Sequence, residues 1–263
     1  YFFDSNIYAN RVYNGWGKAD PDAEIKFGPG IVDWPKMTAL TDDLLLKVVS
    51  VIHDPVTTTD ELIPSGETSS YRSNPLGLAE FTLSRKDPAY VGRAKQVQLA
   101  EKARLTAASE EEIYAANGEL KAVYETIRTR FSADPLKIQI GSTIYAVKPG
   151  DGSAREQAAS CQKVLGGFAN IAKEYATKRY RSNLINWGML PFLADGDEEF
   201  GNGDYIFLKD VRAMLLENRR EITAYNASRG MKEFTLRIGE LTKDETDIIL
   251  QGCLINYYRE TSC

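Results

Sequence analysis

The chain has 263 residues and a net charge of −5 at pH 7, with 43% apolar and 26% charged residues, as in ordinary globular domains. This acidic balance argues against the basic footprint of a nucleic-acid-binding protein. No apolar run approaches the roughly 20 residues that a membrane-spanning helix requires, so we expect neither nucleic acid nor membrane as a partner.

The start of the sequence and its cysteines bear on compartment and cofactor. The chain begins at Tyr1 rather than Met, which suggests a fragment or a chain whose start has been removed. It shows no charged-then-apolar leader, so secretion is not indicated and we expect a cytoplasmic protein. Cys161, Cys253 and Cys263 form no C-x-x-C pair, and His53 is the one histidine. This sparse set predicts no zinc site, no self-contained iron–sulfur cluster and a reducing compartment.

The amino-acid composition of the first third of the chain predicts four segments of different structure. Residues 1–43 are rich in Gly, Pro, Asp and Asn, which predicts an irregular linker or tail from an upstream domain. The apolar run at 44–53 predicts a buried strand. Residues 54–75 predict a long loop, which in a compact domain is usually functional or mobile, and residues 76–84 have helical spacing.

Residues 89–131 also have helical spacing, with a capping box at Ser109 and Glu112, and we interpret them as a helical insertion on the outside of the domain. Residues 136–147 predict two short strands around Gly141. The later elements expected are helices at 154–165, at 178–186 and from a capping box at Thr242 and Glu245 through Tyr258, and strands at 168–172, 205–208 and 234–238. Strands alternating with helices predict an α/β domain over residues 44–263.

A glycine-rich turn at Gly150-Asp151-Gly152 leads directly into a predicted helix, with Ser153 at the N-cap position and Arg155 in the first turn. Helix N-termini present unpaired N–H groups and the positive end of the helix dipole, which together attract anions. A guanidinium there can also grip a carboxylate through two hydrogen bonds. A capping serine needs no function, however, so an anion site and a plain cap both remain open on this stretch alone.

Two further polar stretches are ambiguous by themselves. Asp60 is followed twelve residues later by Arg72, and the alternatives are a turn cap for Asp60 and a surface position for Arg72. Lys178, Arg179 and Arg181 form a small basic cluster, which we interpret as the solvated face of a helix.

Four motifs in this order, TTDELIPSG, YRSN, GSAREQ and YRSNLINWGMLPF, resemble the C-terminal swivel domain of the aconitase superfamily, and bacterial aconitase-like hydratases in particular. The family carries T-D-H-I-x-P-A-G, an Arg, G-S-S-R-E-H and R-A-N-L-I-N-x-G-I-L-P. LTKDETDIILQGCLINY looks like the family's last helix, so the match runs from about residue 45 to residue 258. The resemblance implies a three-layer swivelling β/β/α domain, here with the helical insertion.

The resemblance also implies residue roles. It makes Ser153 the catalytic base, places Arg72, Ala154 and Arg155 in the site that binds substrate carboxylates, and gives Asp60 a supporting role. We therefore expect Ser153 and Arg155 at one helix mouth, facing the same cavity as Arg72.

Four positions depart from the family pattern. Ala154 replaces the second Ser, Ile63 replaces another Ser, and Glu61 and Gln157 replace two histidines. These changes leave the acid/base residues in place and bear on the choice of substrate.

The implied function is that of an aconitate hydratase-like hydro-lyase, which dehydrates and rehydrates a 2-hydroxy di- or tricarboxylate such as citrate or isocitrate. In the family a [4Fe-4S] cluster assists this chemistry. This chain lacks the ligands, so we expect the cluster-binding aconitase domains in cis or in trans as partners, and no catalysis by the chain alone. The alternatives are a free-standing small subunit of an isopropylmalate dehydratase-like enzyme and a non-catalytic anion-binding module. The acidic charge argues against an RNA-binding, iron-responsive regulator.

Overall fold

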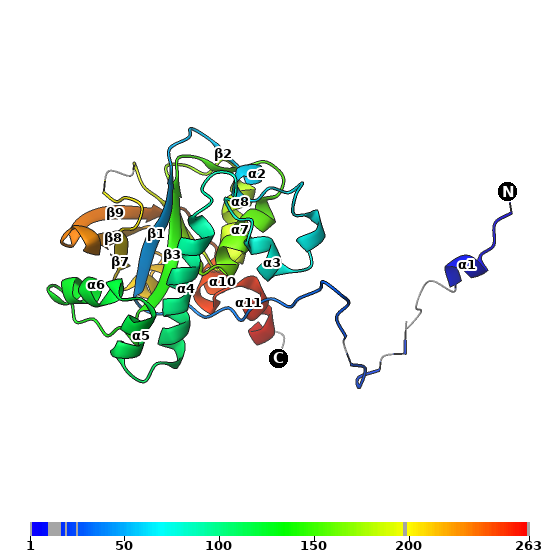
Figure 1. Ribbon diagram of the computed structural model, residues 1–263, viewed down its shortest axis with the longest axis horizontal. Helices are drawn as coiled ribbons and strands as arrows, with labels where there is room; N and C mark the ends of the chain where they lie inside the picture. Colours follow the sequence, from blue (N-terminus) through cyan, green and yellow to red (C-terminus); the bar gives the residue numbers. More distant parts are fainter. Residues whose placement is uncertain (1, 10–16, 19, 25, 197–198, 262–263) are drawn as a thin grey trace. The chain divides into compact units, whose positions relative to one another are not determined.

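The computed structural model describes residues 2–9, 17–18, 20–24, 26–196 and 199–261 (Figure 1). The chain divides into two units, Tyr1–Ile31 and Val32–Cys263. The described residues of the first unit are irregular apart from one short helix, α1 (Asn6–Ala9). The second unit carries every described strand and the candidate site.

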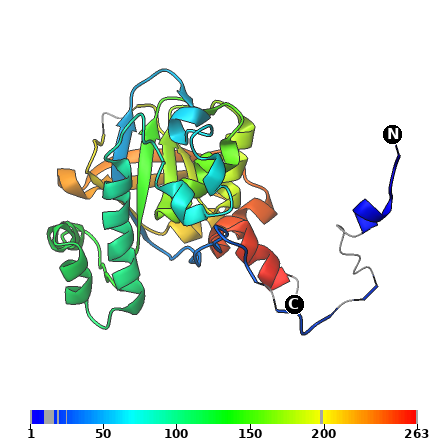
Figure 2. The ribbon, with the colours of Figure 1, turned by 45° about the vertical axis from the view of Figure 1, so that its right-hand side comes forward.

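The second unit is built on a closed barrel with the strand order β1-β3-β5-β6-β9-β8-β7 (Figures 1 and 2). The strands are β1 (Leu44–Ile52), β3 (Gln139–Ala146), β5 (Gly167–Ala172), β6 (Leu190–Leu193), β7 (Tyr205–Leu208), β8 (Glu221–Asn226) and β9 (Lys232–Ile238). The pairs from β1 to β6 are parallel, and the remaining pairs are antiparallel. The α/β class is confirmed, whereas the expected three-layer arrangement is not.

Alternate residues of β1 face two different apolar clusters, as the two-residue period of a strand requires. Leu45 and Val49 belong to a cluster shared with the helices α4 (Tyr90–Thr106) and α7 (Arg155–Val164). Leu44 and Leu46 belong to the other cluster, which is shared mainly with the later strands. β1 is therefore buried on both faces, which explains its nearly continuous apolar sequence.

The helices expected over residues 89–131 are α4, α5 (Glu110–Ala116) and α6 (Glu119–Arg128). α4 packs against β1 and β3 and contributes buried side chains to the core. Lys47 of β1 donates a hydrogen bond to Glu119 at 2.5 Å, which ties α6 to the barrel. The interpretation of this region as an insertion stays a prediction.

Two local expectations in this part of the chain are wrong. The Ser109 side chain makes no capping hydrogen bond, and Glu112 instead accepts from the Ala108 N–H at 3.3 Å. Gly141 lies inside the continuous strand β3 rather than at a turn. A Cβ at Gly141 would overlap the Phe168 side chain, so the glycine is needed because the Phe168 ring lies against the backbone of β3.

The later helices follow the expectations closely. α8 (Lys178–Asn186) has the predicted bounds, and both arms of the Thr242–Glu245 capping box are present at the start of α10 (Lys243–Gln251). The helix expected through Tyr258 is interrupted at Gly252, whose φ is +93°, and the chain continues as α11 (Leu254–Thr261). α9 (Val211–Leu216) lies between β7 and β8.

The C-terminal end of α8 meets two other segments at glycines. A Cβ at Gly188 would overlap the carbonyl of Gly252, and a Cβ at Gly252 would overlap the carbonyl of Thr38. The backbone near residue 38 is also paired with the end of α10, because the Leu40 N–H donates to Leu250 O at 3.0 Å. Three chain segments are therefore packed backbone against backbone at this point.

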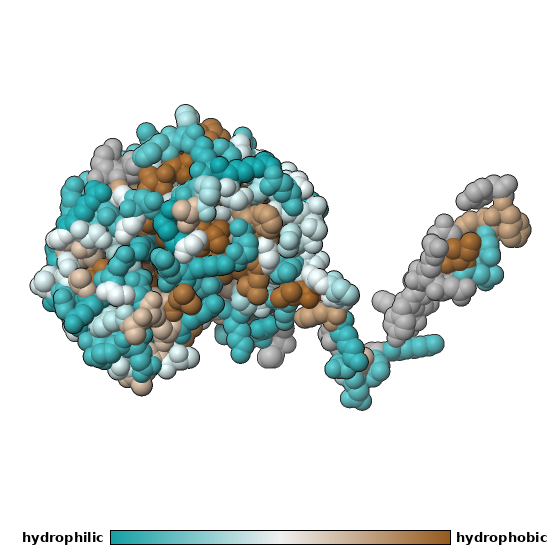
Figure 3. All heavy atoms as spheres, in the orientation of Figure 1, coloured by the Kyte–Doolittle hydropathy of each residue, from teal (hydrophilic) through white to brown (hydrophobic). Residues whose placement is uncertain are grey.

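Hydrophilic residues surround small apolar patches on the face shown in Figure 3. Among the residues that the structure describes, no helix is long and apolar enough to cross a membrane.

Candidate active site

The loops that follow β1 and β3 meet in a small parallel sheet of β2 (Thr57–Thr58) and β4 (Pro149–Asp151). The Thr57 N–H donates to the carbonyl of Lys148 at 3.0 Å. β1 and β3 are parallel neighbours, so their carboxyl ends deliver both loops to the same edge of the barrel. This pairing brings the motif that contains Asp60 next to the motif that contains Ser153.

Two glycines set the turn that presents Ser153. Gly150 has φ +97° and Gly152 has φ +131°, backbone angles that residues other than glycine rarely adopt. A Cβ at Gly150 would overlap the Tyr180 ring, and a Cβ at Gly152 would overlap the Thr59 hydroxyl. The turn therefore fits tightly between α8 and the start of α2 (Thr59–Leu62).

Glu61, at the position of a family histidine, has a structural task. It closes a capping box with Thr58 and contacts Lys86 at 3.2 Å. Burial raises the pKa of the Glu61 carboxyl, but hydrogen bonds from Thr58 and Lys86 outweigh burial and lower it below its usual value. Glu61 is absent from the lining of the pocket described below.

Asp60 organises the loop that leads to Arg72. Its Oδ1 accepts hydrogen bonds from the Ser65 N–H at 3.1 Å and from the Ser65 hydroxyl at 3.2 Å. Its Oδ2 accepts from Arg85 at 3.0 Å, and the same guanidinium reaches Glu67 at 2.6 Å. These contacts are what a supporting residue would make, and the role itself stays a prediction.

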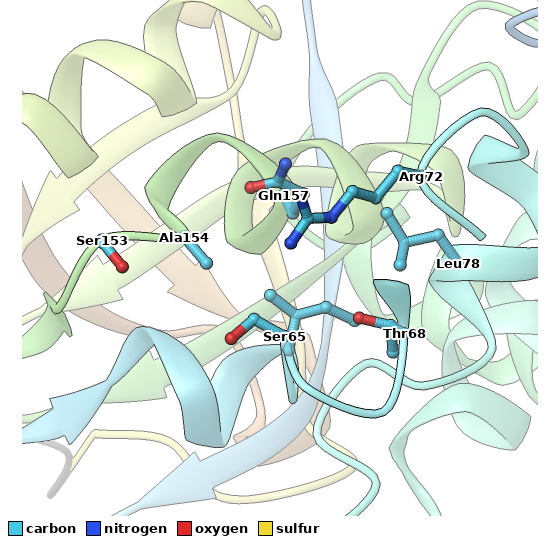
Figure 4. Close-up of a pocket in the computed structure, with 8 residues that line it drawn as sticks. Ser65, Thr68, Arg72, Leu78, Ser153, Ala154 and Gln157 are labelled. Atoms are coloured by element: carbon cyan, nitrogen blue, oxygen red, sulfur yellow. The ribbon is translucent and has the colours of Figure 1, made fainter. Parts of the chain in front are cut away.

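Arg72 lines a pocket of about 220 Å³ with Ser153, Ala154 and Gln157 (Figure 4). The rest of the lining consists of Ile63, Ser65, Thr68 and Leu78. Arg72 precedes α3 (Pro75–Ala79), which packs against α7, and the side chains of Arg72 and Gln157 lie beside each other in the close-up. The Arg72 guanidinium is exposed and forms no ion pair with any described residue.

Arg155 lines a second, shallower pocket of about 360 Å³, together with Ser153 and Glu156. α8 supplies the remaining lining residues, which are Lys178, Arg179, Ser182 and Asn183. The expectation that Arg72 and Arg155 face one cavity is therefore wrong in detail. They line two pockets that share Ser153, because α7 begins at Arg155 and separates the two arginines.

Ser153 does not cap α7. The N-cap position belongs to Ala154, and this end of the helix has no side-chain capping hydrogen bond. The Ser153 side chain is exposed and makes no hydrogen bond within the described part of the chain. The plain-cap interpretation is therefore wrong, and the hydroxyl of Ser153 is available to a ligand.

The described residues contain no group of three or more His, Cys, Asp or Glu side chains that could hold a metal ion. Cys161 and Cys253 are buried free thiols, and burial raises the pKa of Cys161 to about 12, which disfavours the thiolate that binds iron. Cys263 lies outside the described residues. The donor set that the structure describes does not fit an iron–sulfur cluster.

Sequence reasoning missed the position of the basic cluster on α8. Arg181 donates to the carbonyl of Glu240 at 2.7 Å, whereas Lys178 and Arg179 line the Arg155 pocket. A signal was present, because the residues one helical turn later are Ser182 and Asn183 rather than acids that could pair with the two cations.

Comparison with known proteins gives consistent matches. Residues 94–197 match the model of the Aconitase C-terminal domain. The methanogen homoaconitase small subunit of Methanocaldococcus jannaschii is 31% identical over 128 residues, which are 48% of this chain and 66% of that protein. The mitochondrial homocitrate dehydratase of Saccharomyces cerevisiae is 30% identical over 115 residues, which are 41% of this chain and 14% of that protein. The chain thus spans only part of each relative.

The crystal structure of 3-isopropylmalate dehydratase from M. jannaschii shares the fold, with a TM-score of 0.50 and 21% identity. The alignment covers 84% of this chain and 95% of that chain. The ordered motifs, the domain match and the related small subunit agree that residues 94–197 carry an Aconitase C-terminal domain, and that the chain is homologous to the small subunit of homoaconitase.

Proposed function

We propose that this chain is the substrate-binding and proton-abstracting part of an aconitase-type hydro-lyase that acts on a 2-hydroxy di- or tricarboxylate such as citrate or isocitrate. One observation carries the proposal: Ser153 is shared by two pockets, and each pocket contains an arginine that has no ion pair among the described residues. An unpaired guanidinium in a pocket is suited to a carboxylate ligand.

The chemistry assigned to the chain is binding and proton removal. Arg72 and Arg155 each hold one carboxylate of the substrate and so fix which C–H bond faces Ser153. The Ser153 alkoxide takes that proton, and positive potential from the α7 N-terminus and Arg155 stabilises the alkoxide. In the reverse direction the Ser153 hydroxyl returns the proton to carbon.

A [4Fe-4S] cluster, as in the aconitase family, would help the substrate hydroxyl to depart. Because the described donor set does not fit such a cluster, we assign it to a domain or subunit other than this chain. The domain would then swivel as a body against the cluster-binding part, and we place the assembly in the cytoplasm. The chain alone would fold and bind substrate without turning it over.

The second candidate has the same function with a different chain organisation, in which this chain is a free-standing small subunit of an isopropylmalate dehydratase-like enzyme. It is favoured by the related homoaconitase small subunit, of which the match covers 66%, and it leaves the roles of Ser153, Arg72 and Arg155 unchanged. A non-catalytic anion-binding module would use the same pockets without proton transfer.

Replacing Ser153 by Ala in the chain joined to its cluster-binding part tests the proposal. We expect kcat to fall by a factor of about 10² to 10⁴, the usual contribution of an acid/base group, while KM stays within about threefold. Ser132→Ala, which changes an exposed serine outside both pockets, is the matched control and should change neither value much. A Ser153→Ala variant that loses affinity and keeps kcat would support the binding module instead.

A further inference from the structure

We propose that Lys178 and Arg179 on α8 extend the Arg155 pocket into a further anion subsite, and that this subsite binds the third carboxylate of a tricarboxylate substrate whose other two carboxylates are held by Arg72 and Arg155. The inference rests on the proposed function, since it takes Ser153 as the centre of the site. The inference adds Lys178 and Arg179 to the proposed binding site, and it narrows the proposed substrate class from di- or tricarboxylates to tricarboxylates.

The charge of the pocket supports an anionic ligand. Arg155, Lys178 and Arg179 line it, and none of them forms an ion pair with a described residue. The single carboxylate in the lining, Glu156, accepts a hydrogen bond from the Trp187 indole at 3.1 Å. The lining therefore presents three positive charges against one negative charge.

Two helix N-termini border the same pocket. α7 begins at Arg155 and α8 begins at Lys178, and the two helices pack against each other. α7 has no side-chain cap, because its N-cap residue is Ala154. In α8 the Thr177 hydroxyl accepts from the Tyr180 N–H at 3.2 Å, which satisfies one backbone donor. The remaining N–H groups and both dipoles add positive potential.

The first turn of α8 contains cations where helices prefer acids. It carries no acidic residue, while Lys178 and Arg179 stand at the positive end of the dipole, where their charge is unfavourable. A bound carboxylate would reverse this effect, because it would attract both side chains and the helix end at once.

A buried donor on Arg155, a residue that lines this pocket, lacks a partner. The Nε atom of Arg155 is buried and has no hydrogen-bond partner among the described residues. Buried polar atoms in folded proteins almost always have a partner. This atom has almost no accessible surface, so a carboxylate in the pocket would become its partner once the Arg155 side chain turns toward the ligand, and Arg155 would then link Ser153 to the two cations on α8.

The two pockets on either side of Ser153 differ in chemistry. The Arg72 pocket includes apolar Ile63, Leu78 and Ala154, whereas the described lining of the Arg155 pocket is entirely polar or charged. A substrate that fills both pockets would place one anionic arm on Arg72 and another near Lys178 and Arg179, which have no ion pair among the described residues.

Calorimetric titration of the 263-residue chain with two unreactive probes tests the proposal. Tricarballylate has three carboxylates and succinate has two. In the double variant Lys178→Gln/Arg179→Gln we expect affinity for tricarballylate to fall about tenfold, the effect of losing one hydrogen-bonded charge pair, and affinity for succinate to change less than about twofold. Arg181→Gln, on the same helix but bonded to Glu240 O, should leave both affinities unchanged.

Equal losses for both probes would mean that the two cations act only through overall charge, and would overturn the inference. An unchanged double variant would overturn it too. If Arg72→Gln and Arg155→Gln still weaken both probes in that case, the proposed function survives. If those variants also bind normally, the proposed function fails as well. Circular dichroism should show a folded double variant, since the change removes cations from a helix N-terminus.

Discussion

Arg85 donates a hydrogen bond to Asp60 at 3.0 Å, and this ion pair fixes the start of the loop that ends at Arg72. Replacing Asp60 by Asn removes the charge while keeping an oxygen for Ser65. We expect KM to rise by a factor of about three, the scale of an exposed ion pair, with a smaller change in kcat. Steady-state kinetics of the assembled enzyme measure this. Asp195→Asn, which breaks a comparable surface pair with Arg237, should leave KM unchanged.

Gly152 should tolerate no side chain. Its φ of +131° and the nearby Thr59 hydroxyl mean that Gly152→Ala is both strained and crowded. We expect a loss of about 1–3 kcal/mol in the free energy of unfolding, measured with urea, and a drop in kcat because Ser153 is displaced. Gly66→Ala is the control, because nothing lies within 4 Å of its Cβ position. Equal stability of the two variants would contradict the tight turn.

Lys163 should make stability depend on pH in the alkaline range. The side chain is buried against Phe168, and burial lowers its pKa from 10.5 to about 8. Between these values the unfolded chain binds more protons than the folded chain, so stability rises as pH increases from about 8 to 10.5, and the full cost of the buried ammonium is present below pH 8. Lys163→Met should therefore be more stable than the parent at pH 7, by up to about 3 kcal/mol.

Urea unfolding at several pH values between 7 and 11 measures this dependence. The advantage of Lys163→Met should shrink toward zero above pH 10.5, where Lys163 is neutral in both states. Lys102→Met changes an exposed lysine that lines the same surface pocket as Lys163, and it should show no such trend. A parent protein whose stability follows the Met variant at every pH would rule out the buried ammonium.

Ala154→Ser restores the hydroxyl that the family pattern has at this position. Ala154 lines the Arg72 pocket beside Ser153, so the new hydroxyl can donate to a substrate carboxylate. We expect the ratio of kcat/KM for citrate to that for an alkyl-substituted malate to rise about tenfold, the value of one hydrogen bond to a charged group. Ala107→Ser, far along the chain at the end of α4, should leave the ratio unchanged.

Local signals explain why some elements could be predicted from the sequence. α8 was predicted to the residue, because it has a threonine before it, a Gly after it and helical spacing between. The Thr242–Glu245 box was found for the same reason, since both partners lie within one turn. Gly141 misled the prediction, because its need for glycine comes from Phe168, a residue that is distant in sequence.

The candidate site likewise combines residues that local motifs identify with an arrangement that depends on contacts between distant parts of the sequence. The motifs identified Ser153, Arg155 and Arg72, but their distribution over two pockets depends on where α7 begins and on the pairing of β2 with β4. The closure of the barrel through β1 and β7 likewise joins residues that are far apart, such as Leu44 and Leu208. No local pattern encodes such pairings, so they could not be predicted from one sequence.

The glycine contacts at the far end of α8 bear on how the site can move. The backbones at Gly188, Gly252 and Thr38 lie so close together that a side chain on either glycine would overlap its neighbour, and we expect this close contact to oppose sliding of α8. Lys178 and Arg179 lie at the N-terminal end of this short helix, and its C-terminal end packs against two other chain segments. If the proposed cluster-binding part closes on this pocket, we expect α8 to move together with the elements that it contacts, with little internal rearrangement.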